Sequence, residues 1–396
     1  MSSDFASGFC ILPLPQIYFG TGRFAMLPTL CPIYGRHLLV VTGRSALQRS
    51  GRLSTLFDAF AGEGFSVIHV TVDREPSPEL IDSTVMENRG RLVEAVIAIG
   101  GGSVLDAGKA ISAMLRQHHP VECFIEGREG VMPHDGRKVP FIAVPTTSGT
   151  GSEVTNNAVI SRVGVGGYKR SLRHQAFVPD IAVIDPELMT SAPRGLTAAS
   201  GMDACTQLLE AYLSPFASPY TDALSLSGLE CFSRSFMAAC STGSMDPAIR
   251  SDIAYAALMS GIALANAGLG IVHGFASSVG GLFDISHGTL CATLLAEATK
   301  VNIGRLRMID PRHPALVKYS KAGGILAGAA AGSVDEGCDL LVARLEAWQD
   351  TLGFPALREF GVRESDLDGI VAATRSKSNA VALEHEEMRS ILDARM

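Results

Sequence analysis

Two histidines, His273 and His287, lie in a stretch rich in Gly and Ala that spans residues 266–302. A charged or metal-binding side chain in such apolar surroundings is costly unless it has partners. Candidate partners lie some seventy positions upstream, at Asp203 and Gln207. These two residues are four apart, which places them on one face of a helix. We interpret the two segments as halves of one site.

Asp203, His273 and His287 together offer one carboxylate and two imidazoles. This set suits a divalent transition metal, with Fe(II) and Zn(II) as the leading choices. Gln207 could add a neutral amide oxygen as a fourth ligand. We therefore predict that the first three residues are catalytic through the metal that they hold. Spacing alone leaves open the alternative that both histidines are hydrogen-bonded residues of the core or of turns.

The first 190 residues alternate short apolar runs with helical patterns. The strands are expected at residues 38–42, 65–72, 95–99, 141–144 and 181–184, and the helices between them at 53–64, 77–91 and 104–115. Continuous apolar strands that alternate with helices predict a parallel sheet covered on both faces. We expect residues 1–190 to form an α/β dinucleotide-binding domain with a Rossmann-like sheet.

The remainder of the chain, residues 191–396, has a different pattern. Helical periodicity fills residues 196–214, 220–239, 247–265, 272–280, 289–301, 334–352 and 364–373, and few strand-like runs remain. We expect an all-helical domain that carries the metal and substrate site.

Composition limits the classes of function. A chain of 396 residues is longer than a single hydrophobic core usually organises, so more than one domain is expected. A content of 47% hydrophobic and 18% charged residues excludes a disordered protein. A net charge of −7 without a basic run argues against nucleic-acid or anionic-membrane partners. The eight cysteines form no CxxC pair, the N-terminus does not resemble a signal peptide, and no run of about 20 apolar residues suggests a membrane span. We expect a cytoplasmic protein.

Two loops after strands contain residues suited to phosphate binding. Residues 100–103 read Gly-Gly-Gly-Ser and open a helix, whose free N–H groups can bind an anion. Asp106 falls in the first helical turn, where a carboxylate is favourable. The second loop, PTTSGTGSE at 145–153, contributes Thr146, Thr147 and Thr150. A tight turn without a ligand is the alternative for the first loop, but the pair of loops predicts a shared nucleotide cleft.

Gly43, Arg44 and Ser45 follow the first strand. Enzymes that use NAD often place an acid near the ribose hydroxyl, whereas NADP enzymes place small residues and an Arg there. This segment has no acid and does have Arg44. We therefore hypothesise that NADP is accepted, with an Arg on a solvated turn as the alternative.

Several segments together resemble the iron-containing (group III) alcohol dehydrogenases, whose fold is related to dehydroquinate synthase and glycerol dehydrogenase. The matching segments are IYFGTG at 17–22, GGGSVLDAGKAI at 100–111, PTTSGTGSEVT at 145–155, VPDIAVIDPEL at 178–188, GMDACTQLLEAYLS at 201–214 and GLGIVHGFASSVGG with SHGTLCATLL within 268–295. The resemblance implies NAD or NADP on the first domain and one divalent metal, Fe(II) or Zn(II), in the cleft between the domains. It also implies reversible hydride transfer between an alcohol and an aldehyde or ketone, whose carbonyl the metal polarises.

The resemblance assigns roles to particular positions. Asp203, His273 and His287 match metal ligands. The positions that meet the dinucleotide match Gly101, Gly102, Ser103, Thr146, Thr147 and Lys169. The resemblance further implies a small-molecule alcohol or aldehyde substrate, and a homodimer or larger homo-oligomer that associates near residues 17–20.

Two positions depart from the pattern of the family. Gln207 and Ser277 stand where the family usually has histidine. An amide oxygen in place of an imidazole should weaken the binding of a transition metal. The serine removes a proton relay, so water or a ribose hydroxyl of the cofactor must supply the proton.

These departures keep other functions open. Because the family includes metal-free reductases, one alternative is a metal-independent oxo-acid reductase similar to maleylacetate reductase, with Arg170 or Arg173 holding the substrate carboxylate. A dehydroquinate synthase-like lyase would need several basic groups near the metal, and residues 200–300 contain only Arg234, Arg250 and Lys300. A non-catalytic binding protein is a further alternative, although the intact cofactor loops argue against it.

Overall fold

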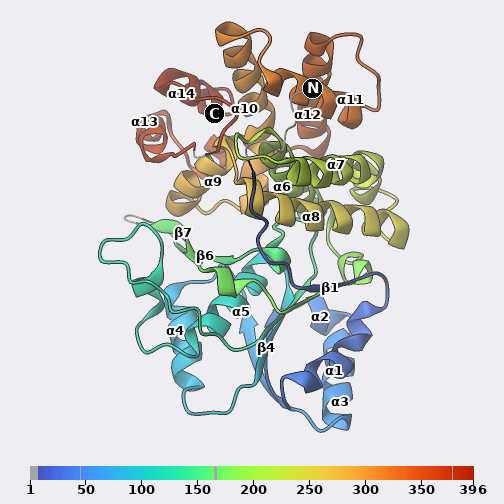
Figure 1. The fold of residues 1–396 in the computed structure, drawn as a ribbon, viewed down its shortest axis with the longest axis vertical. Coiled ribbons are helices and arrows are strands. Elements are labelled where there is room, and N and C mark those ends of the chain that lie inside the picture. Colours follow the sequence, from blue (N-terminus) through green and yellow to red (C-terminus); the bar gives the residue numbers. More distant parts are fainter. Residues whose placement is uncertain (1–7, 45, 165–166, 377) are drawn as a thin grey trace.

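The computed structural model of the chain describes residues 8–396 except 45, 165–166 and 377. One half contains a parallel sheet with its helices, and the other half is built from helices alone (Figure 1). The predicted fold class, an α/β part followed by an all-helical part, is confirmed. The two halves meet along the carboxyl ends of the strands, which places the loops of the sheet beside the helices.

The sheet has six parallel strands in the order β1-β8-β5-β4-β2-β3. Their bounds are β1 Gln16–Phe19, β2 His37–Gly43, β3 Ser66–Val72, β4 Ala95–Gly100, β5 Phe141–Pro145 and β8 Ile181–Ile184. Successive side chains of a strand point to opposite faces. Accordingly Leu38 and Val40 join one apolar cluster, whereas Leu39 and Val41 join another on the opposite face. Burial of both faces explains why these strands read as continuous apolar runs.

Helices cover both faces of this sheet. The first face holds α1 Leu27–Leu30 and α3 Arg52–Gly62, and the second holds α5 Gly102–Met114 with α4 Pro78–Glu87 beside it. A short α2, Ala46–Arg49, precedes α3. The start of α4 follows from its sequence, because the Ser77 hydroxyl accepts a hydrogen bond from the Leu80 N–H and Pro78 occupies the first turn.

The strand order reverses between β2 and β4. Strand β3 pairs with one side of β2 and β4 with the other. In open α/β sheets, ligands bind at such a reversal, outside the carboxyl ends of the strands. Gly43 and Gly100 are the last residues of these two strands, so the predicted cofactor segments lie at the reversal.

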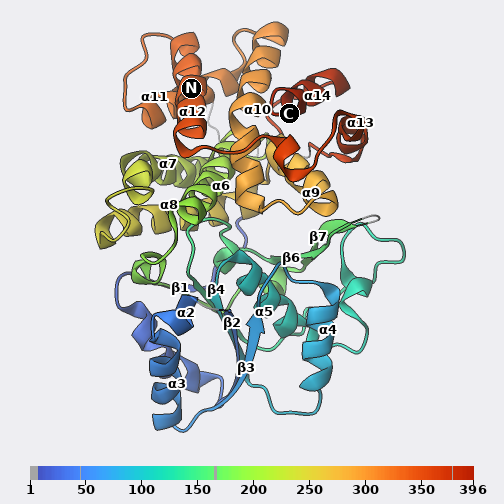
Figure 2. The same ribbon diagram turned by 180° about the vertical axis from the view of Figure 1, so that it is seen from behind.

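An antiparallel hairpin, β6 Asn157–Arg162 and β7 Tyr168–Arg173, was not predicted from the sequence. Its signal was the alternation that buries Ala158 and Ile160 on one strand and Leu172 on the other. The hairpin contacts α5 of the sheet half and α9 of the helical half. In both views it lies at the junction of the two halves (Figures 1 and 2).

The helical half contains nine α-helices among its described residues. They are α6 Arg194–Leu213, α7 Pro219–Ala239, α8 Pro247–Ala267, α9 Ile271–Leu282, α10 His287–Ile309, α11 Pro314–Ala327, α12 Val334–Leu352, α13 Glu364–Ala373 and α14 His385–Asp393.

Short 3-10 helices occur in both halves, at Arg23–Met26, Cys31–Ile33, Val121–Phe124, Ser152–Val154, Gln175–Phe177, Pro186–Met189 and Leu357–Phe360. The sequence missed α11 and α14, and it placed the start of α10 at residue 289 instead of His287.

Helix α8 is long and apolar enough to cross a membrane by length and composition, which the sequence analysis did not anticipate. It packs against both α6 and α7, and most of its apolar window is buried inside the protein. We therefore interpret α8 as a core helix of the helical half. The chain also links the halves near its start, since the Leu12 N–H donates to Asn266 Oδ1 of α8 at 2.8 Å.

Candidate active site

Four side chains from three helices converge in the helical half. Asp203 lies on α6, His273 in the first turn of α9, and His287 and Cys291 on α10. Asp203 Oδ1 is 3.4 Å from His273 Nε2 and 3.5 Å from His287 Nε2. Cys291 Sγ is 3.9 Å from each of the same two nitrogens. One ligand atom from each of the four residues lies within 4.8 Å of the others, and we call this group the ligand cluster.

The atoms of the ligand cluster suit a cation. Asp203 Oδ1 is buried without a hydrogen-bond partner, and His287 Nδ1 is also unpaired. An unpaired buried carboxylate oxygen is costly, and a bound metal would remove that cost. Two imidazoles and a carboxylate form a donor set of the kind that holds Zn(II) or Fe(II). Asp203, His273 and His287, predicted from the sequence to act together, therefore fit a divalent metal.

Glu210, one turn beyond Gln207 on α6, holds His273 in place. Its Oε2 lies 2.6 Å from His273 Nδ1, and its Oε1 accepts a hydrogen bond from the Val272 N–H at 2.7 Å. A carboxylate on Nδ1 fixes the tautomer and leaves Nε2 to face the ligand cluster. Glu210 is thus a positioning residue for His273.

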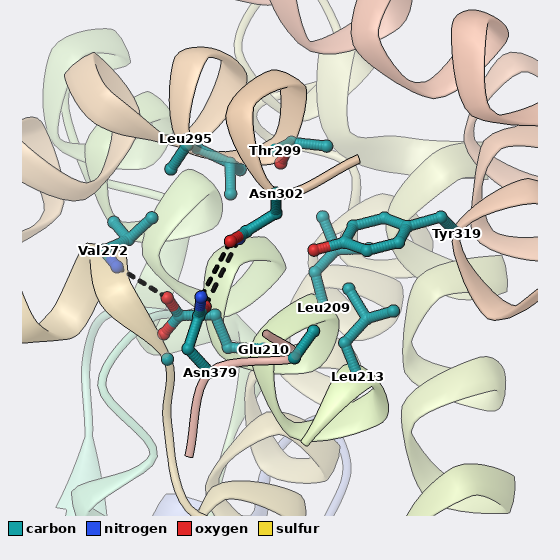
Figure 3. Close-up of a pocket in the computed structure, with 12 residues that line it drawn as sticks. Leu209, Glu210, Leu213, Val272, Leu295, Thr299, Asn302, Tyr319 and Asn379 are labelled. Atoms are coloured by element: carbon teal, nitrogen blue, oxygen red, sulfur yellow. Dashed lines mark hydrogen bonds between the residues drawn. The ribbon is translucent and has the colours of Figure 1, made fainter. Parts of the chain in front are cut away.

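A small cavity lies behind Glu210, on the side away from the sheet half. Figure 3 shows Glu210 bonded to Val272, with Asn302 and Asn379 paired beside it and the Tyr319 hydroxyl pointing toward them. The two amides exchange hydrogen bonds of 2.7 and 3.3 Å. Glu210 lines this cavity together with residues of α9, α10 and α11, so its surroundings depend on the packing of these helices against α6.

The two positions that depart from the family pattern have partners of their own. The Gln207 amide oxygen accepts a hydrogen bond from Ser260 Oγ of α8 at 2.7 Å. The Ser277 hydroxyl is exposed and donates to the His273 carbonyl at 3.1 Å. A ligand role for Gln207 stays a prediction. Ser277 is tied to its own helix, which agrees with the expected loss of a proton relay.

Burial and charge set the protonation of the ligand cluster. Burial lowers the pKa of His287 to about 4, with Lys169 nearby adding to the effect. Burial also disfavours the Asp203 carboxylate, but His287 and His273 outweigh it and hold its pKa below the usual value. His273 is buried too, yet Cys291, Glu210 and Asp203 raise its pKa. A neutral His287 and an ionised Asp203 present free lone pairs, as metal binding requires.

Residues 100–103 form the glycine turn, and residues 145–151, before the 3-10 helix Ser152–Val154, form the threonine loop. The two lie against each other at the carboxyl edge of the sheet. Gly101 precedes α5, and a Cβ built on Gly102 would lie 2.5 Å from Thr150 Cγ2. A Cβ on Gly101 would lie 3.4 Å from Thr147. Thr146 N–H donates to the Gly100 carbonyl at 2.9 Å. The structure thus brings the glycines and threonines of the two loops together, and Ser103 lies in the first turn of α5.

The same threonine loop reaches the helical half. A Cβ on Gly149 would lie 2.8 Å from Ser200 Cβ of α6, and a Cβ on Gly151 would lie 2.4 Å from Gly261 Cα of α8. Only glycine permits so close an approach of two backbones. The loop therefore connects the carboxyl edge of the sheet with α6, the helix that carries Asp203.

Arg44 follows β2, beside the end of β3. Its guanidinium lies 3.6 Å from Asp73 Oδ2, and both side chains are exposed. The segment that follows β3 therefore supplies an acid that the segment after β2 lacks. Gly43 ends β2, whereas Ser45 lies outside the described residues.

Lys169 and Asp106 meet different partners. Lys169 on β7 pairs with Glu75, and its charge acts on His287, so it lies between the sheet loops and the ligand cluster. Asp106 accepts hydrogen bonds from Ser152 Oγ at 2.6 Å and from the Val159 N–H at 3.0 Å. Because α5 begins at Gly102, Asp106 lies beyond its first turn, and the predicted place in the first turn is wrong. Asp106 instead fixes the hairpin on α5, and its predicted cofactor contact stays a prediction.

The two arginines proposed for an oxo-acid substrate are engaged elsewhere. Arg170 donates to the Gly127 carbonyl, and Arg173 lies 3.0 Å from Glu126 Oε1. Both therefore hold the loop before the threonine loop, and no feature of the ligand cluster favours that alternative.

Sequence reasoning missed Glu210 and Cys291. Each had a signal, since Glu210 is seven residues after Asp203 and Cys291 is four after His287, spacings that return to the same face of a helix. The cysteine was interpreted only as one of several buried thiols.

Comparisons with known proteins agree across the whole chain. A family model described as "Iron-containing alcohol dehydrogenase" matches residues 15–186, and one described as "Fe-containing alcohol dehydrogenase family, C-terminal" matches residues 197–396. The chain is 34% identical over 360 residues to long-chain-alcohol dehydrogenase 1 of Geobacillus thermodenitrificans (strain NG80-2), covering 90% of this chain and 87% of the relative.

Two further proteins are similar over nearly the full length. The NADPH-dependent butanol dehydrogenase of Clostridium saccharobutylicum is 29% identical over 396 residues, with 96% of both chains covered. The crystal structure of a 1,3-propanediol oxidoreductase matches with a TM-score of 0.87 and 26% identity, covering 98% of this chain and 100% of that one. With family models matching both halves and a relative 34% identical over 90% of the chain, the chain belongs to the iron-containing alcohol dehydrogenase family.

Proposed function

We propose that this oxidoreductase interconverts small alcohols and their aldehydes or ketones with NAD or NADP, using a divalent metal held by Asp203, His273 and His287. Membership of the family makes the protein an NAD(P)-dependent alcohol dehydrogenase that acts on CH–OH groups. The observation that carries the metal assignment is the approach of both Nε2 atoms to Asp203 Oδ1, at 3.4 and 3.5 Å, while that oxygen has no other partner.

Residues of this chain prepare the reaction. A divalent metal supplies a Lewis acid that polarises the carbonyl, and nicotinamide supplies or accepts the hydride. Glu210 orients the His273 imidazole, and the helix N-terminus after Gly101 offers N–H groups to the pyrophosphate. Because Ser277 donates to its own helix, the proton for the alcohol comes from water or from a ribose hydroxyl.

For the cofactor, Arg44 supports acceptance of NADP alongside NAD. A guanidinium binds a phosphate through charge-assisted hydrogen bonds, and Arg44 is exposed beside the reversal of the sheet. Asp73 next to it supplies the acid that a ribose hydroxyl prefers. The relative from Clostridium saccharobutylicum is named as NADPH-dependent, which agrees with this proposal.

We also propose a domain organisation, an oligomeric state and a cellular location for the protein. We assign residues 1–190 and 191–396 to two domains, because β8 ends at Ile184 and α6 begins at Arg194. A homodimer or larger homo-oligomer through β1 is supported by the place of β1 at one edge of the sheet. Eight free cysteines suit the reducing cytoplasm.

The test combines metal analysis with nicotinamide absorbance. Protein purified without added metal is assayed for Fe and Zn, and oxidation of NADH and NADPH is followed with a panel of aldehydes. The assay is repeated after chelation and after return of each metal. We expect activity with aldehydes that chelation abolishes and metal restores. His287→Ala should lose both metal and activity, whereas His385→Ala, which alters an exposed histidine of α14, should lose neither.

The outcomes separate the parts of the proposal. Full activity in a metal-free preparation would remove the metal and favour the metal-independent reductase. Absence of oxidation with every aldehyde and both nucleotides would remove the dehydrogenase itself.

A further inference from the structure

Cys291 occupies a place in the ligand cluster that the sequence comparison with the family does not assign. It lies one helical turn after His287, it is fully buried, and its Sγ faces both imidazole Nε2 atoms at 3.9 Å. Asp203 Oδ1, which is buried and unpaired, completes the group. The thiol therefore points into the space that the other three ligand atoms surround.

The separations between these atoms fit tetrahedral coordination. With bonds of about 2.0–2.1 Å to N or O and about 2.3 Å to S, tetrahedral angles place neighbouring ligand atoms about 3.4 Å apart for N and O and about 3.6 Å apart for N and S. The observed separations are 3.4 and 3.5 Å from Asp203 Oδ1 to the two nitrogens, and 3.9 Å from Cys291 Sγ to each nitrogen. A movement of a few tenths of an ångström by the sulfur would bring these four separations to the tetrahedral values.

Gln207 is a weaker candidate for the fourth ligand. Its amide oxygen already accepts a hydrogen bond from Ser260 Oγ. A neutral amide is also a poor ligand for a transition metal, whereas a thiolate is a strong one and is selective for soft and borderline metals such as Zn(II). Coordination would release the thiol proton to solvent.

We propose that Cys291 is a thiolate ligand of the divalent metal, completing an Asp203, His273, His287 and Cys291 set, and that this set prefers Zn(II) to Fe(II). The inference rests on the metal-binding part of the proposed function. It goes further by assigning the fourth ligand to α10 instead of α6, and by naming the preferred metal.

The test uses Co(II) as a spectroscopic substitute for Zn(II). The purified full-length protein is stripped with a chelator and titrated with Co(II). A thiolate bound to Co(II) gives an intense near-ultraviolet charge-transfer band, in addition to the visible bands of the metal itself. We expect this band in the wild type, its loss in Cys291→Ser, and its retention in Gln207→Ala. Cys205→Ala, which alters another fully buried thiol next to the cluster in sequence, should also retain it.

Metal competition supplies a second measurement. Changing a residue that only hydrogen-bonds to a metal ligand typically lowers metal affinity by roughly 10- to 100-fold. Loss of a direct ligand in Cys291→Ser should therefore weaken Zn(II) binding by more than about 100-fold. Fe(II) binding should weaken less, so the ratio of Zn(II) to Fe(II) affinity should fall in Cys291→Ser. Zinc X-ray absorption of the wild type needs no variant, and it should show one sulfur at about 2.3 Å.

Failure of this inference can be told from failure of the proposed function. If Co(II) gives visible bands but no thiolate band in the wild type, or if Cys291→Ser keeps that band, Cys291 is not a ligand while the metal site stands. Absence of sulfur in the zinc absorption spectrum has the same meaning and does not depend on folding of the variant. If the wild type binds none of Co(II), Zn(II) and Fe(II), this inference fails together with the metal-binding part of the proposed function.

Discussion

Glu210 Oε2 lies 2.6 Å from His273 Nδ1, and this contact turns the opposite nitrogen of the ring toward Asp203 and His287. The same carboxylate accepts from the Val272 N–H, so it also fixes the first turn of α9. One residue of α6 thereby links α9 to α6 and sets the tautomer of His273, for which we propose a metal-ligand role. This carboxylate–histidine pair is a common support for metal sites.

We expect Glu210→Gln to weaken metal binding by roughly 10- to 100-fold, as is typical when an outer-shell partner is changed. The amide cannot accept from both His273 Nδ1 and the Val272 N–H, because one of its two ends is a donor. The dissociation constant of Zn(II), measured by competition with a chelating dye, checks this. Glu346→Gln, at a half-exposed glutamate of α12, is the control. A lower Tm of Glu210→Gln with unchanged metal affinity would mean that Glu210 only stabilises the fold.

The closeness of the two cofactor loops gives a second prediction. Gly102→Ala would place a Cβ 2.5 Å from Thr150 Cγ2, a distance that real Cβ contacts do not show. The loops must separate, so KM for both nicotinamide nucleotides should rise. Combining Gly102→Ala with Thr150→Ala, which removes the contacting atoms, should recover part of the loss. Gly62→Ala in α3, where no atom lies within 4 Å, should leave KM unchanged. Wild-type KM values in Gly102→Ala would show that this contact does not shape the nucleotide site.

A third prediction concerns the choice between NAD and NADP. Arg44→Ala should lower kcat/KM for NADPH by about tenfold relative to NADH, since a charge-assisted hydrogen bond contributes about 1.5 kcal/mol. Asp73→Asn should shift the ratio the opposite way, because it removes a carboxylate that competes for Arg44 and repels a phosphate. Arg74→Ala is a matched control, as Arg74 is exposed and also contacts Asp73. An unchanged cofactor ratio in Arg44→Ala would exclude Arg44 from the nucleotide site.

The buried Glu153, in the 3-10 helix that follows the threonine loop, predicts a pH dependence of stability. Burial raises its pKa from 4.5 to about 7. The folded protein then keeps this proton up to about pH 7, whereas the unfolded chain loses it near pH 4.5. Because the unfolded state binds fewer protons in that window, this group makes stability fall as the pH rises through it, by ~3 kcal/mol in all.

Glu153→Gln removes this dependence. We expect its Tm to exceed that of the wild type at pH 8 and to approach the wild-type value near pH 4.5. Thermal unfolding at several pH values checks this, with Glu129→Gln at an exposed position as the control. A difference in Tm that does not vary with pH would show that Glu153 is not the titrating group.

The sequence of apolar and polar residues along the chain was sufficient to predict much of the fold. Residues 38–41 and 95–99 are apolar without interruption because both faces of their strands are buried, so their place in a parallel sheet could be inferred from the sequence. The hairpin of β6 and β7 was missed because its alternation is short and polar residues fill its exposed positions. Helix α11 was missed because Gly323 and Gly324 weaken a helical pattern that packing against α12 and α7 stabilises.

The candidate site, like the fold, could be predicted from the sequence only in part. The sequence by itself supplied the types of residue, since Asp203, His273 and His287 suit a metal, and it supplied the glycine turn whose backbone suits a phosphate. Only the tertiary structure determined which residues surround them. It places Glu210 behind His273, Cys291 beside both histidines, and Asp73 beside Arg44. The physical reason is that spacing along a chain determines neighbours only within one helix or strand, whereas α6, α9 and α10 come together through packing of side chains distant in sequence.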